Sequence, residues 1–123
     1  MTAVLDASAV LALLFREKGA TEVEDVLGDS MISAVNWSEV VQKLAARGVP
    51  APEALFVLGL QVEPFTLVDA RTAATMWSRA RALGLSLADR ACLALAARFD
   101  AEAWTADRAW ATSDLSVRVR VIR

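Results

Sequence analysis

The sequence predicts an α/β domain built on a mostly parallel sheet. Short apolar segments alternate along the chain with longer segments whose apolar residues recur at helical spacing, which is typical of parallel sheets with helical crossovers. The 123 residues suffice for a single domain, over residues 1–123, with a substantial core. Apolar residues make up 56% of the chain and the mean hydropathy is +0.41. We therefore expect a partner or dimer surface in addition to the core.

Five segments are predicted as strands. Three of them are short apolar runs, which fit buried positions. A fourth contains Pro64 and a fifth alternates apolar with charged residues, and both features are typical of edge strands. In chain order the predicted strands are 2–5, 30–35, 61–67, 101–106 and 117–122.

Six helices are predicted between these strands: 7–16, 21–28, 36–48, 51–60, 69–84 and 86–99. Asn36, Asp69 and Ser86 are the expected N-caps of three of them, and several helices end before a glycine. Trp77 lies on the apolar stripe of its helix, so we expect it in the core. Asp107 is expected to begin a short turn or helix after the fourth strand.

The residue types that are missing narrow the possible chemistry. The chain contains no histidine and a single cysteine, Cys92. Serine–histidine–aspartate triads, cysteine–histidine pairs and zinc sites built on histidine are therefore excluded. Cys92 alone can form neither an internal disulfide nor a cysteine-based zinc site, and we expect it to be a small buried hydrophobic residue. Polar catalysis would have to use carboxylates, hydroxyls, Arg, Lys or a metal ion.

Charge and hydropathy bear on location and partners. The net charge is −2, so no overall positive field attracts nucleic acid. The 13 basic residues comprise eleven Arg and two Lys, and Arg suits bidentate phosphate contacts. No apolar run reaches the roughly 18 residues that span a bilayer, and no basic region precedes the N-terminal apolar stretch, which Asp6 interrupts. We therefore expect a cytoplasmic protein without a membrane partner.

Four acidic residues stand at junctions between predicted strands and helices. Asp6, Glu39 and Asp107 each follow a predicted strand, and Asp89 stands in the first turn of the last long helix. Ligands of open α/β sheets bind at the carboxyl ends of the strands, where three of these acids are placed. Asp6 is flanked on both sides by apolar runs, where an unpaired carboxylate is costly to bury.

Each acid also has a purely structural interpretation. Carboxylates at helix N-termini are stabilised by the helix dipole by about 0.3–1 kcal/mol. The segments "NWSE" and "SLAD" resemble capping boxes, and Glu39 could pair with Lys43 one turn later. Two further acids, Asp100 and Asp114, are predicted as surface or turn residues.

A shared metal ion would explain the four acids together. Carboxylates that converge repel one another and need a cation to remain ionised. Oxygen ligands without His or Cys favour magnesium (Mg²⁺) or manganese (Mn²⁺). An oxygen-ligated ion with open coordination positions suits the hydrolysis of phosphodiesters.

The four acids lie within motifs that resemble one known family. The motifs are "LDASAVLALL", "VNWSEVVQKL", "LSLADRACLALA" and "WTADRAW", in that order. Their order and spacing closely resemble those of the PIN-domain ribonucleases, and among these the VapC-type toxins of VapBC toxin–antitoxin pairs. The resemblance covers nearly the whole chain.

This resemblance implies a PIN-like three-layer α/β/α sandwich with a central sheet of about five strands. It also implies a metal-dependent endoribonuclease. Asp6 and Asp89 would be the core ligands of Mg²⁺ or Mn²⁺, and Asp107 would complete the site directly or through water. Glu39 would position a second metal ion or the attacking water.

Further residues and partners follow from the same resemblance. Ser8 and Thr105 would supply hydroxyls behind the ligands. Family members are commonly dimers, and a small antitoxin covers their acidic groove. The implied partners are therefore an RNA substrate, an antitoxin and a second copy of the chain.

Several neighbours of the acids need separate interpretation. Trp37 and Trp104 depart from the small or aliphatic residues usual at these positions, although neither replaces a ligand. Arg90 and Arg108 directly follow two of the proposed ligands and could contact RNA phosphates or be solvated. Trp110 could belong to the core or stack on a base, and we favour the core.

Two alternative functions remain open. The first is another Asp-based phosphohydrolase. A haloacid-dehalogenase-like phosphatase would need a second Asp where Ser8 stands. A response-regulator receiver would need a Lys near its fifth strand, whereas Lys18 and Lys43 both lie in the first half of the chain. A non-catalytic protein-binding α/β domain, with acids that only cap helices, fits the apolar surplus. Convergence of the four carboxylates would favour the nuclease.

Overall fold

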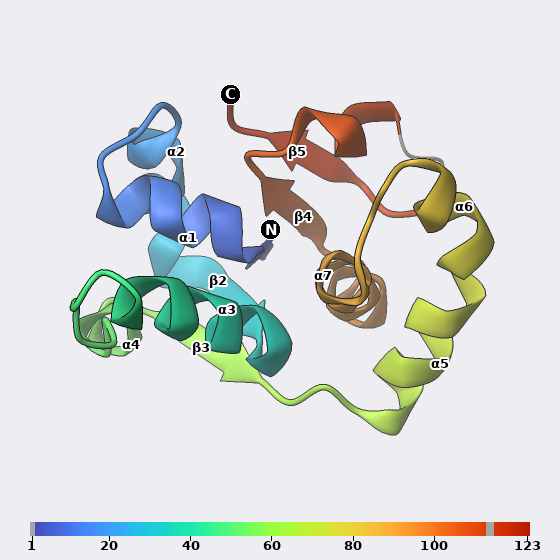
Figure 1. Ribbon diagram of the computed structural model, residues 1–123, viewed down its shortest axis with the longest axis horizontal. Coiled ribbons are helices and arrows are strands. Elements are labelled where there is room, and N and C mark those ends of the chain that lie inside the picture. The colour runs from blue at the N-terminus through green and yellow to red at the C-terminus, as the bar shows by residue number, and fades with distance from the viewer. Residues whose placement is uncertain (1, 113–114) are drawn as a thin grey trace.

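The computed structural model describes residues 2–112 and 115–123, which are organised around a five-stranded sheet (Figure 1). Its strands are β1 (Ala3–Leu5), β2 (Ser30–Ser33), β3 (Leu60–Glu63), β4 (Glu102–Thr105) and β5 (Val119–Val121). The order is β3-β2-β1-β4-β5, and every neighbouring pair is parallel. The predicted α/β class and the predicted edge positions of β3 and β5 are confirmed.

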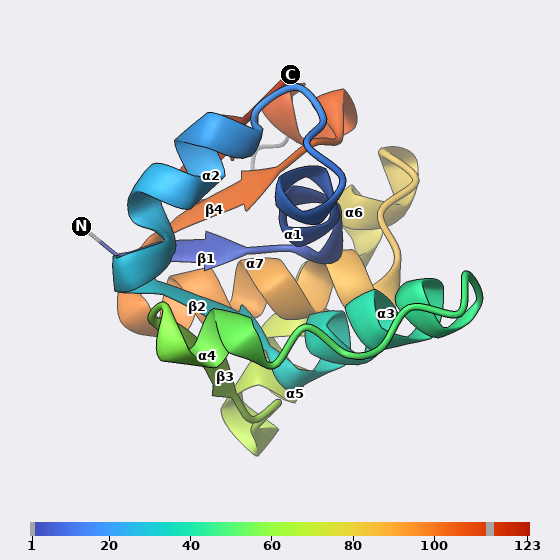
Figure 2. The same ribbon diagram turned by 90° about the vertical axis from the view of Figure 1, so that its left-hand side faces the viewer.

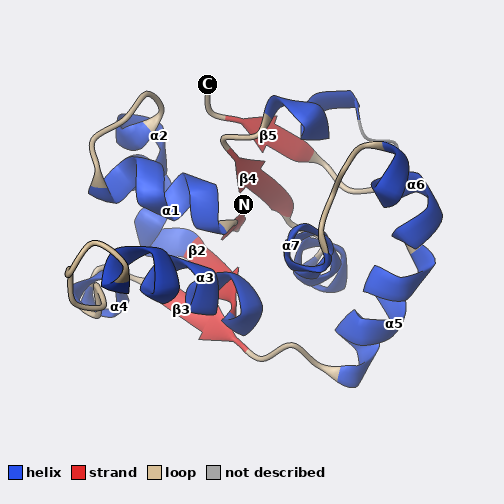
Figure 3. Cartoon of the chain, viewed as in Figure 1, coloured by secondary structure: helices blue, strands red, loops and turns tan. Residues whose placement is uncertain are grey.

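Helices cover both faces of the sheet and make the three expected layers. In the described part of the chain they are α1 (Ala7–Leu14), α2 (Ala20–Val26), α3 (Ala34–Ala45), α4 (Ala54–Val57), α5 (Leu67–Thr75), α6 (Trp77–Ala82) and α7 (Leu87–Phe99), with short 3₁₀ helices η1 (Leu27–Asp29) and η2 (Arg108–Thr112). Helices α1 to α4 lie on one side of the strands and α5 to α7 on the other (Figure 3). None of the described helices combines the length and apolar content needed to cross a membrane.

Alternate residues of the strands supply two separate cores. Ala3 and Leu5 of β1 pack with residues of α1 to α4, whereas Val4 packs with residues of α6 and α7. The cores separate in this way because successive side chains of a strand point to opposite faces. Figure 2, seen from the side of α1 to α4, shows α7 behind the sheet.

The start of α7 follows the prediction closely. Ser86 is the N-cap, its hydroxyl accepts a hydrogen bond from the Asp89 amide at 3.1 Å, and Asp89 Oδ2 accepts one from the Ser86 amide at 2.9 Å. This reciprocal pair is a complete capping box. The "SLAD" segment therefore has the structural role that its spacing indicates.

Two predicted N-caps are wrong. Helix α3 begins at Ala34 with Ser33 as its N-cap, so Asn36 lies inside the first turn. Helix α5 begins after Thr66, and Asp69 completes the capping box from the third helical position. In both cases a hydroxyl residue three positions upstream reaches the free amides first, because the helix starts as soon as the preceding strand or loop ends.

Other predicted elements differ in extent or burial. The predicted helix 69–84 is divided at Met76 into α5 and α6, and Trp77 is 51% exposed rather than in the core. The ring of Trp77 instead lies under the Arg81 guanidinium. Trp110 and Cys92 are buried as expected. Asp100 is exposed, whereas Asp114 lies outside the described residues.

The predicted helix 51–60 is only one turn long, α4. Pro52 lacks an amide hydrogen and restricts the residue before it, which shortens the helix at its start. At the other end Gly59 has φ +115°, and a Cβ atom there would lie 2.6 Å from Gly28 Cα. Only glycine permits this close crossing, which brings the chain into β3 beside β2.

Candidate functional site

The parallel sheet brings the predicted acids toward one edge. Asp6 directly follows β1, Asp107 lies two residues after β4, and Glu39 lies in α3, which follows β2. Asp89 lies in the first turn of α7. Because all the strands run in the same direction, their carboxyl ends meet at the same edge, which Figure 2 shows at the arrowheads of β1 and β4.

Asp6 is a buried carboxylate with three hydrogen-bond donors. It is 5% exposed. Its Oδ1 accepts hydrogen bonds from Ser8 Oγ at 2.7 Å and from the Ala9 amide at 2.8 Å, and its Oδ2 accepts one from Thr105 Oγ1 at 2.6 Å. Burial raises the pKa of Asp6 to about 6, although these three hydrogen bonds act in the opposite direction and the charge of Asp89 adds slightly to the rise.

Two hydroxyls connect Asp6 to the loop that carries Asp107. Ser8 Oγ accepts a hydrogen bond from the Ala106 amide at 2.9 Å, and Thr105 Oγ1 accepts one from the Asp107 amide at 3.0 Å. Each hydroxyl has one hydrogen, and each donates it to Asp6, so both are orientated as donors toward that carboxylate. The β1–α1 and β4–η2 junctions are thereby held together around Asp6.

Asp107 takes part in this network through its backbone. Its side chain is at the exposed end of the junction, where Oδ1 accepts a hydrogen bond from the Ala109 amide at 2.9 Å. This bond caps η2, as the predicted short turn or helix requires. The structure therefore places Asp107 beside the Asp6 network, with one carboxylate oxygen used in capping.

The charges of three of the predicted acids act on one buried thiol. Cys92 is fully buried on α7, and its Sγ lies 3.9 Å from the Val4 carbonyl oxygen. Burial raises the pKa of Cys92 well above its usual range, and the negative charges of Asp6, Asp89 and Glu39 add to this effect. Asp6, Asp89 and Glu39 therefore all disfavour the ionised form of this thiol.

The expected convergence of the acids on one ion does not give a complete metal site in the described part of the chain. Within residues 2–112 and 115–123, no three His, Cys, Asp or Glu side chains lie close enough together to hold an ion by themselves. Water would have to complete the coordination of an ion at this edge, as is usual for Mg²⁺. The donor set, carboxylate oxygens supported by hydroxyls, fits a hard divalent cation.

The two arginines that could contact RNA phosphates differ in their accessibility. Arg90 Nη1 donates a hydrogen bond to the Ala73 carbonyl of α5 at 2.8 Å, and its Nε is buried. Arg90 therefore connects α7 to α5. Arg108 is exposed at the start of η2, next to Asp107.

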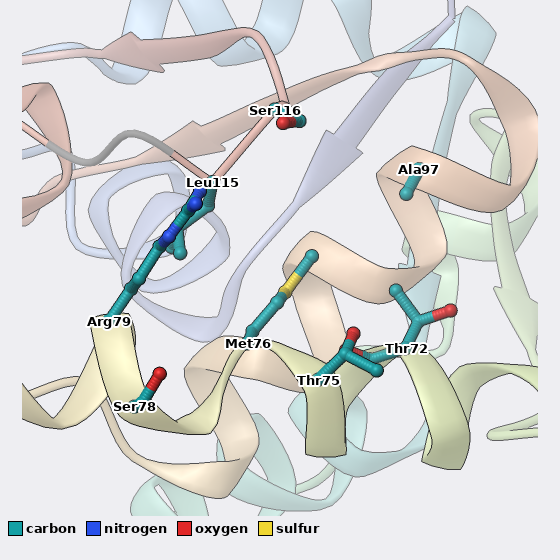
Figure 4. A pocket seen from close by; sticks show the side chains of 8 residues that line it. All are labelled: Thr72, Thr75, Met76, Ser78, Arg79, Ala97, Leu115 and Ser116. Carbon is teal, nitrogen blue, oxygen red and sulfur yellow. The ribbon is translucent and has the colours of Figure 1, made fainter.

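A cavity of about 520 Å³ lies away from the acids, on the side of α5 and α6 (Figure 4). It is lined by Thr72, Thr75, Met76, Ser78, Arg79, Ala97, Leu115 and Ser116. None of these residues carries a carboxylate, so the cavity is distinct from the predicted site. Its lining offers hydroxyls and one guanidinium but no ligand set for a divalent cation.

Comparison with known proteins identifies the family. The model of the PIN domain matches residues 3–114. The chain belongs to the PIN domain family. All four predicted acids fall inside the matched region, and the resemblance that the motifs indicated is confirmed at the level of the family.

Solved structures share the fold of this PIN domain at low sequence identity. A toxin–antitoxin complex from Klebsiella pneumoniae has a chain with a TM-score of 0.77 and 17% identity, which covers 98% of both chains. VapBC2 from Rickettsia felis, bound to a promoter DNA fragment, has a TM-score of 0.71 and 12% identity over 100% of both. The sarcin–ricin-loop-cleaving toxin VapC20 of Mycobacterium tuberculosis has a TM-score of 0.68 and 19% identity over 93% of this chain and 92% of that one. No curated protein matches the sequence.

One polar residue that contacts a predicted site residue of this PIN domain was not predicted from the sequence. Asn36 was expected to cap α3, but it is buried and donates a hydrogen bond from Nδ2 to Glu39 Oε1 at 3.1 Å. The available signal was its spacing, because residues three apart on a helix share a face. No ion pair between Glu39 and Lys43 is found among the described residues.

Proposed function

We propose that this PIN domain is a metal-dependent endoribonuclease and the toxin component of a toxin–antitoxin pair. The buried Asp6 carboxylate carries the proposal. Asp6 caps α1, a role that an exposed carboxylate can also fill, yet it is buried without a cationic partner among the described residues at the cost of a raised pKa, to which the charge of Asp89 adds. A divalent cation would remove that cost, because it favours the ionised form.

In the proposed site, Asp6 and Asp89 are the principal ligands of Mg²⁺ or Mn²⁺. Asp107 completes the site directly or through water, and Glu39 positions a second ion or the attacking water. A bound divalent cation would supply Lewis acidity, which lowers the pKa of water and offsets the charge that develops on a phosphodiester.

The surrounding residues would hold these ligands in place. Ser8 and Thr105 direct their hydroxyl hydrogens at the two oxygens of Asp6, which fixes the plane of its carboxylate. The capping box of α7 fixes Asp89 through Oδ2 and leaves Oδ1 to face a ligand. Arg108 is the more accessible candidate for an RNA phosphate contact, since Arg90 donates to the backbone of α5.

Purified protein should cleave RNA in the presence of Mg²⁺ or Mn²⁺ and stop when EDTA is added. Asp89→Asn should lower the cleavage rate by at least about 1000-fold, because metal ligation contributes several kcal/mol to the transition state. The measurement is single-turnover cleavage of a labelled RNA on denaturing gels. Asp25→Asn, which removes an exposed charge on α2, should cleave like the wild type.

Cleavage by Asp89→Asn at the wild-type rate would exclude the assigned ligand. Absence of any metal-stimulated cleavage by the wild type would favour the non-catalytic protein-binding domain. Hydrolysis of small phosphomonoesters without cleavage of RNA would favour another phosphohydrolase.

We propose a small antitoxin that covers the acidic edge, and a homodimer, as the partners. The structural relatives in Klebsiella pneumoniae and Rickettsia felis are toxin–antitoxin assemblies. In this chain a largely apolar groove of about 190 Å³ between α1, η1 and α4 is lined by Leu13, Leu14, Leu27, Leu55 and Leu58, together with the charged Arg16 and Glu24. Val57, next to it on α4, is 89% exposed. Because η1 and α4 precede β2 and β3, this groove lies at the amino ends of the strands, opposite the acidic edge, and suits a separate apolar segment of the partner.

Val57→Glu should weaken inhibition by the proposed antitoxin, to be sought as the product of an adjacent reading frame, by about 10-fold or more, because a charge would then face an apolar segment. Basal RNA cleavage should not change. The measurement is a titration of cleavage with the purified neighbour, and Ala74→Glu on the opposite helical layer is the matched control. Equal inhibition of both variants would place the partner elsewhere.

A further inference from the structure

Asn36 is a buried polar side chain whose role the capping of α3 does not explain. It is 1% exposed, and Ser33 already accepts the hydrogen bond expected of the N-cap. Asn36 Nδ2 donates one hydrogen bond to Glu39 Oε1 at 3.1 Å and a second to the Ala88 carbonyl oxygen at 3.0 Å. Asn36 thus connects Glu39 of α3 to the first turn of α7.

The two partners determine the orientation of the amide. Both are oxygen acceptors, so only the NH₂ group of Asn36 can face them. The opposite orientation would place Oδ1 against two oxygens. The two amide hydrogens are therefore fully used, one on each helix.

The carbonyl oxygen of the Asn36 side chain indicates that burial of this residue does not by itself stabilise the fold. Oδ1 is buried and has no hydrogen-bond partner in the described part of the chain. A buried acceptor without a partner destabilises the folded protein. An aliphatic residue of similar size would avoid this cost, so the two donated bonds explain the presence of an amide.

We propose that Asn36 is a positioning residue that holds the Glu39 carboxylate at a fixed place relative to Asp89. The proposal rests on the nuclease function proposed above. Ala88 directly precedes Asp89 in the first turn of α7, and the capping box with Ser86 fixes that turn. A carboxylate tied to the same turn keeps a constant separation from Asp89. Glu39 is thereby preorganised toward the cation and its water.

A double-mutant cycle separates this role from simple support of the fold. Asn36→Leu should lower kcat for RNA cleavage and Mn²⁺ affinity by about 10- to 100-fold, with little change in the KM for RNA, as is usual when a residue that orients a ligand is lost. In a Glu39→Gln background the same substitution should change either quantity by less than about threefold, because Asn36 acts through Glu39. Mn²⁺ affinity is measured by calorimetry on the metal-free protein.

Two control variants on α3 test whether a loss of stability alone lowers Mn²⁺ affinity. Val40→Ala creates a cavity in the core and should lower the melting temperature without altering Mn²⁺ affinity. Gln42→Leu removes an exposed amide from the same helix and should alter neither. Should Asn36→Leu not fold, Asn36→Ala removes the same two bonds with a smaller side chain and takes its place in the cycle.

The outcomes distinguish this inference from the proposed function. Equal losses from Asn36→Leu in the wild-type and Glu39→Gln backgrounds, or no loss in either, would overturn the positioning role. A wild type that binds Mn²⁺ without cleaving RNA would overturn the nuclease proposal, while the Mn²⁺ cycle would still test Asn36. Non-additive losses in Mn²⁺ affinity support the inference in either case.

Discussion

Asp6→Asn should abolish RNA cleavage and, at the same time, stabilise the metal-free protein at neutral pH. Loss of this proposed ligand is expected to lower the rate by at least about 1000-fold, since metal ligation would supply several kcal/mol to the transition state. The gain in stability has a separate origin in the burial of the carboxylate. The amide should fit the same place, because its oxygen can accept from Ser8 and Ala9 while its NH₂ faces the Thr105 hydroxyl.

The sign of the stability change follows from the pKa. Burial raises the pKa of Asp6 from 3.8 to about 6, so the folded protein binds this proton more strongly than the unfolded chain does. The contribution of the protonated Asp6 side chain to the free energy of unfolding is present in full below about pH 4. This contribution is lost as the pH rises through about 6. Above that pH the ionised carboxylate costs about 3 kcal/mol, which Asp6→Asn should recover in part.

Urea unfolding in EDTA between pH 4 and pH 8 measures this effect. The difference in free energy of unfolding between Asp6→Asn and the wild type should grow up to about pH 6–7 and then stay constant. Asp25→Asn removes an exposed acid and should show no such rise. A variant no more stable than the wild type at pH 7.5 without metal would contradict the assigned cost of burying Asp6.

Arg98→Met should destabilise the protein by about 3 kcal/mol, since it leaves a buried carboxylate without its partner. Asp69 is 1% exposed, and Arg98 contacts it through Nε at 2.8 Å and Nη2 at 3.2 Å. Arg98 also donates a hydrogen bond from Nη2 to the Pro64 carbonyl at 3.3 Å. The pair therefore ties the end of α7 to the start of α5 and to the loop that leaves β3.

Arg16→Met is the matched control, because the Arg16–Glu24 pair is mostly exposed and should contribute less than about 1 kcal/mol. The measurement is urea unfolding at pH 7. In an Asp69→Asn background, which keeps the capping oxygen but removes the charge, Arg98→Met should cost much less. A similar loss in both backgrounds would show that packing of the Arg98 stem, rather than the buried charge, carries the effect.

Helix capping and metal binding are compatible at this sheet edge. Asp6 caps α1, Asp89 completes the capping box of α7, and Asp107 caps η2. A carboxylate at a helix N-terminus has two oxygens, and capping engages one of them in Asp89 and in Asp107. The same position therefore orients the side chain and leaves an oxygen for a cation, with the helix dipole favouring the charged form.

Local signals in the sequence were enough for most of the fold. The alternation of apolar strands and amphipathic helices predicted the parallel sheet, and Ser86 with Asp89 predicted the start of α7 correctly. The alternating C-terminal segment correctly predicted β5 as an edge strand; β3 is also an edge strand, although it ends at Glu63, so that the predicted strand 61–67 was too long and Pro64 lies just outside β3. These features depend on residues a few positions apart, whose interactions are the same whatever the rest of the chain does.

The sequence by itself also determined the residue types available for chemistry: carboxylates and hydroxyls at strand ends, and no histidine. Only the tertiary structure decided that Thr105 donates to Asp6 across 99 positions, that Asn36 bridges two helices and that Asp69 pairs with Arg98. It also left Trp77 exposed on a helix whose stripe predicted burial. The physical reason is that burial and long-range hydrogen bonds depend on which elements become neighbours, and helical or strand periodicity carries no information about that choice.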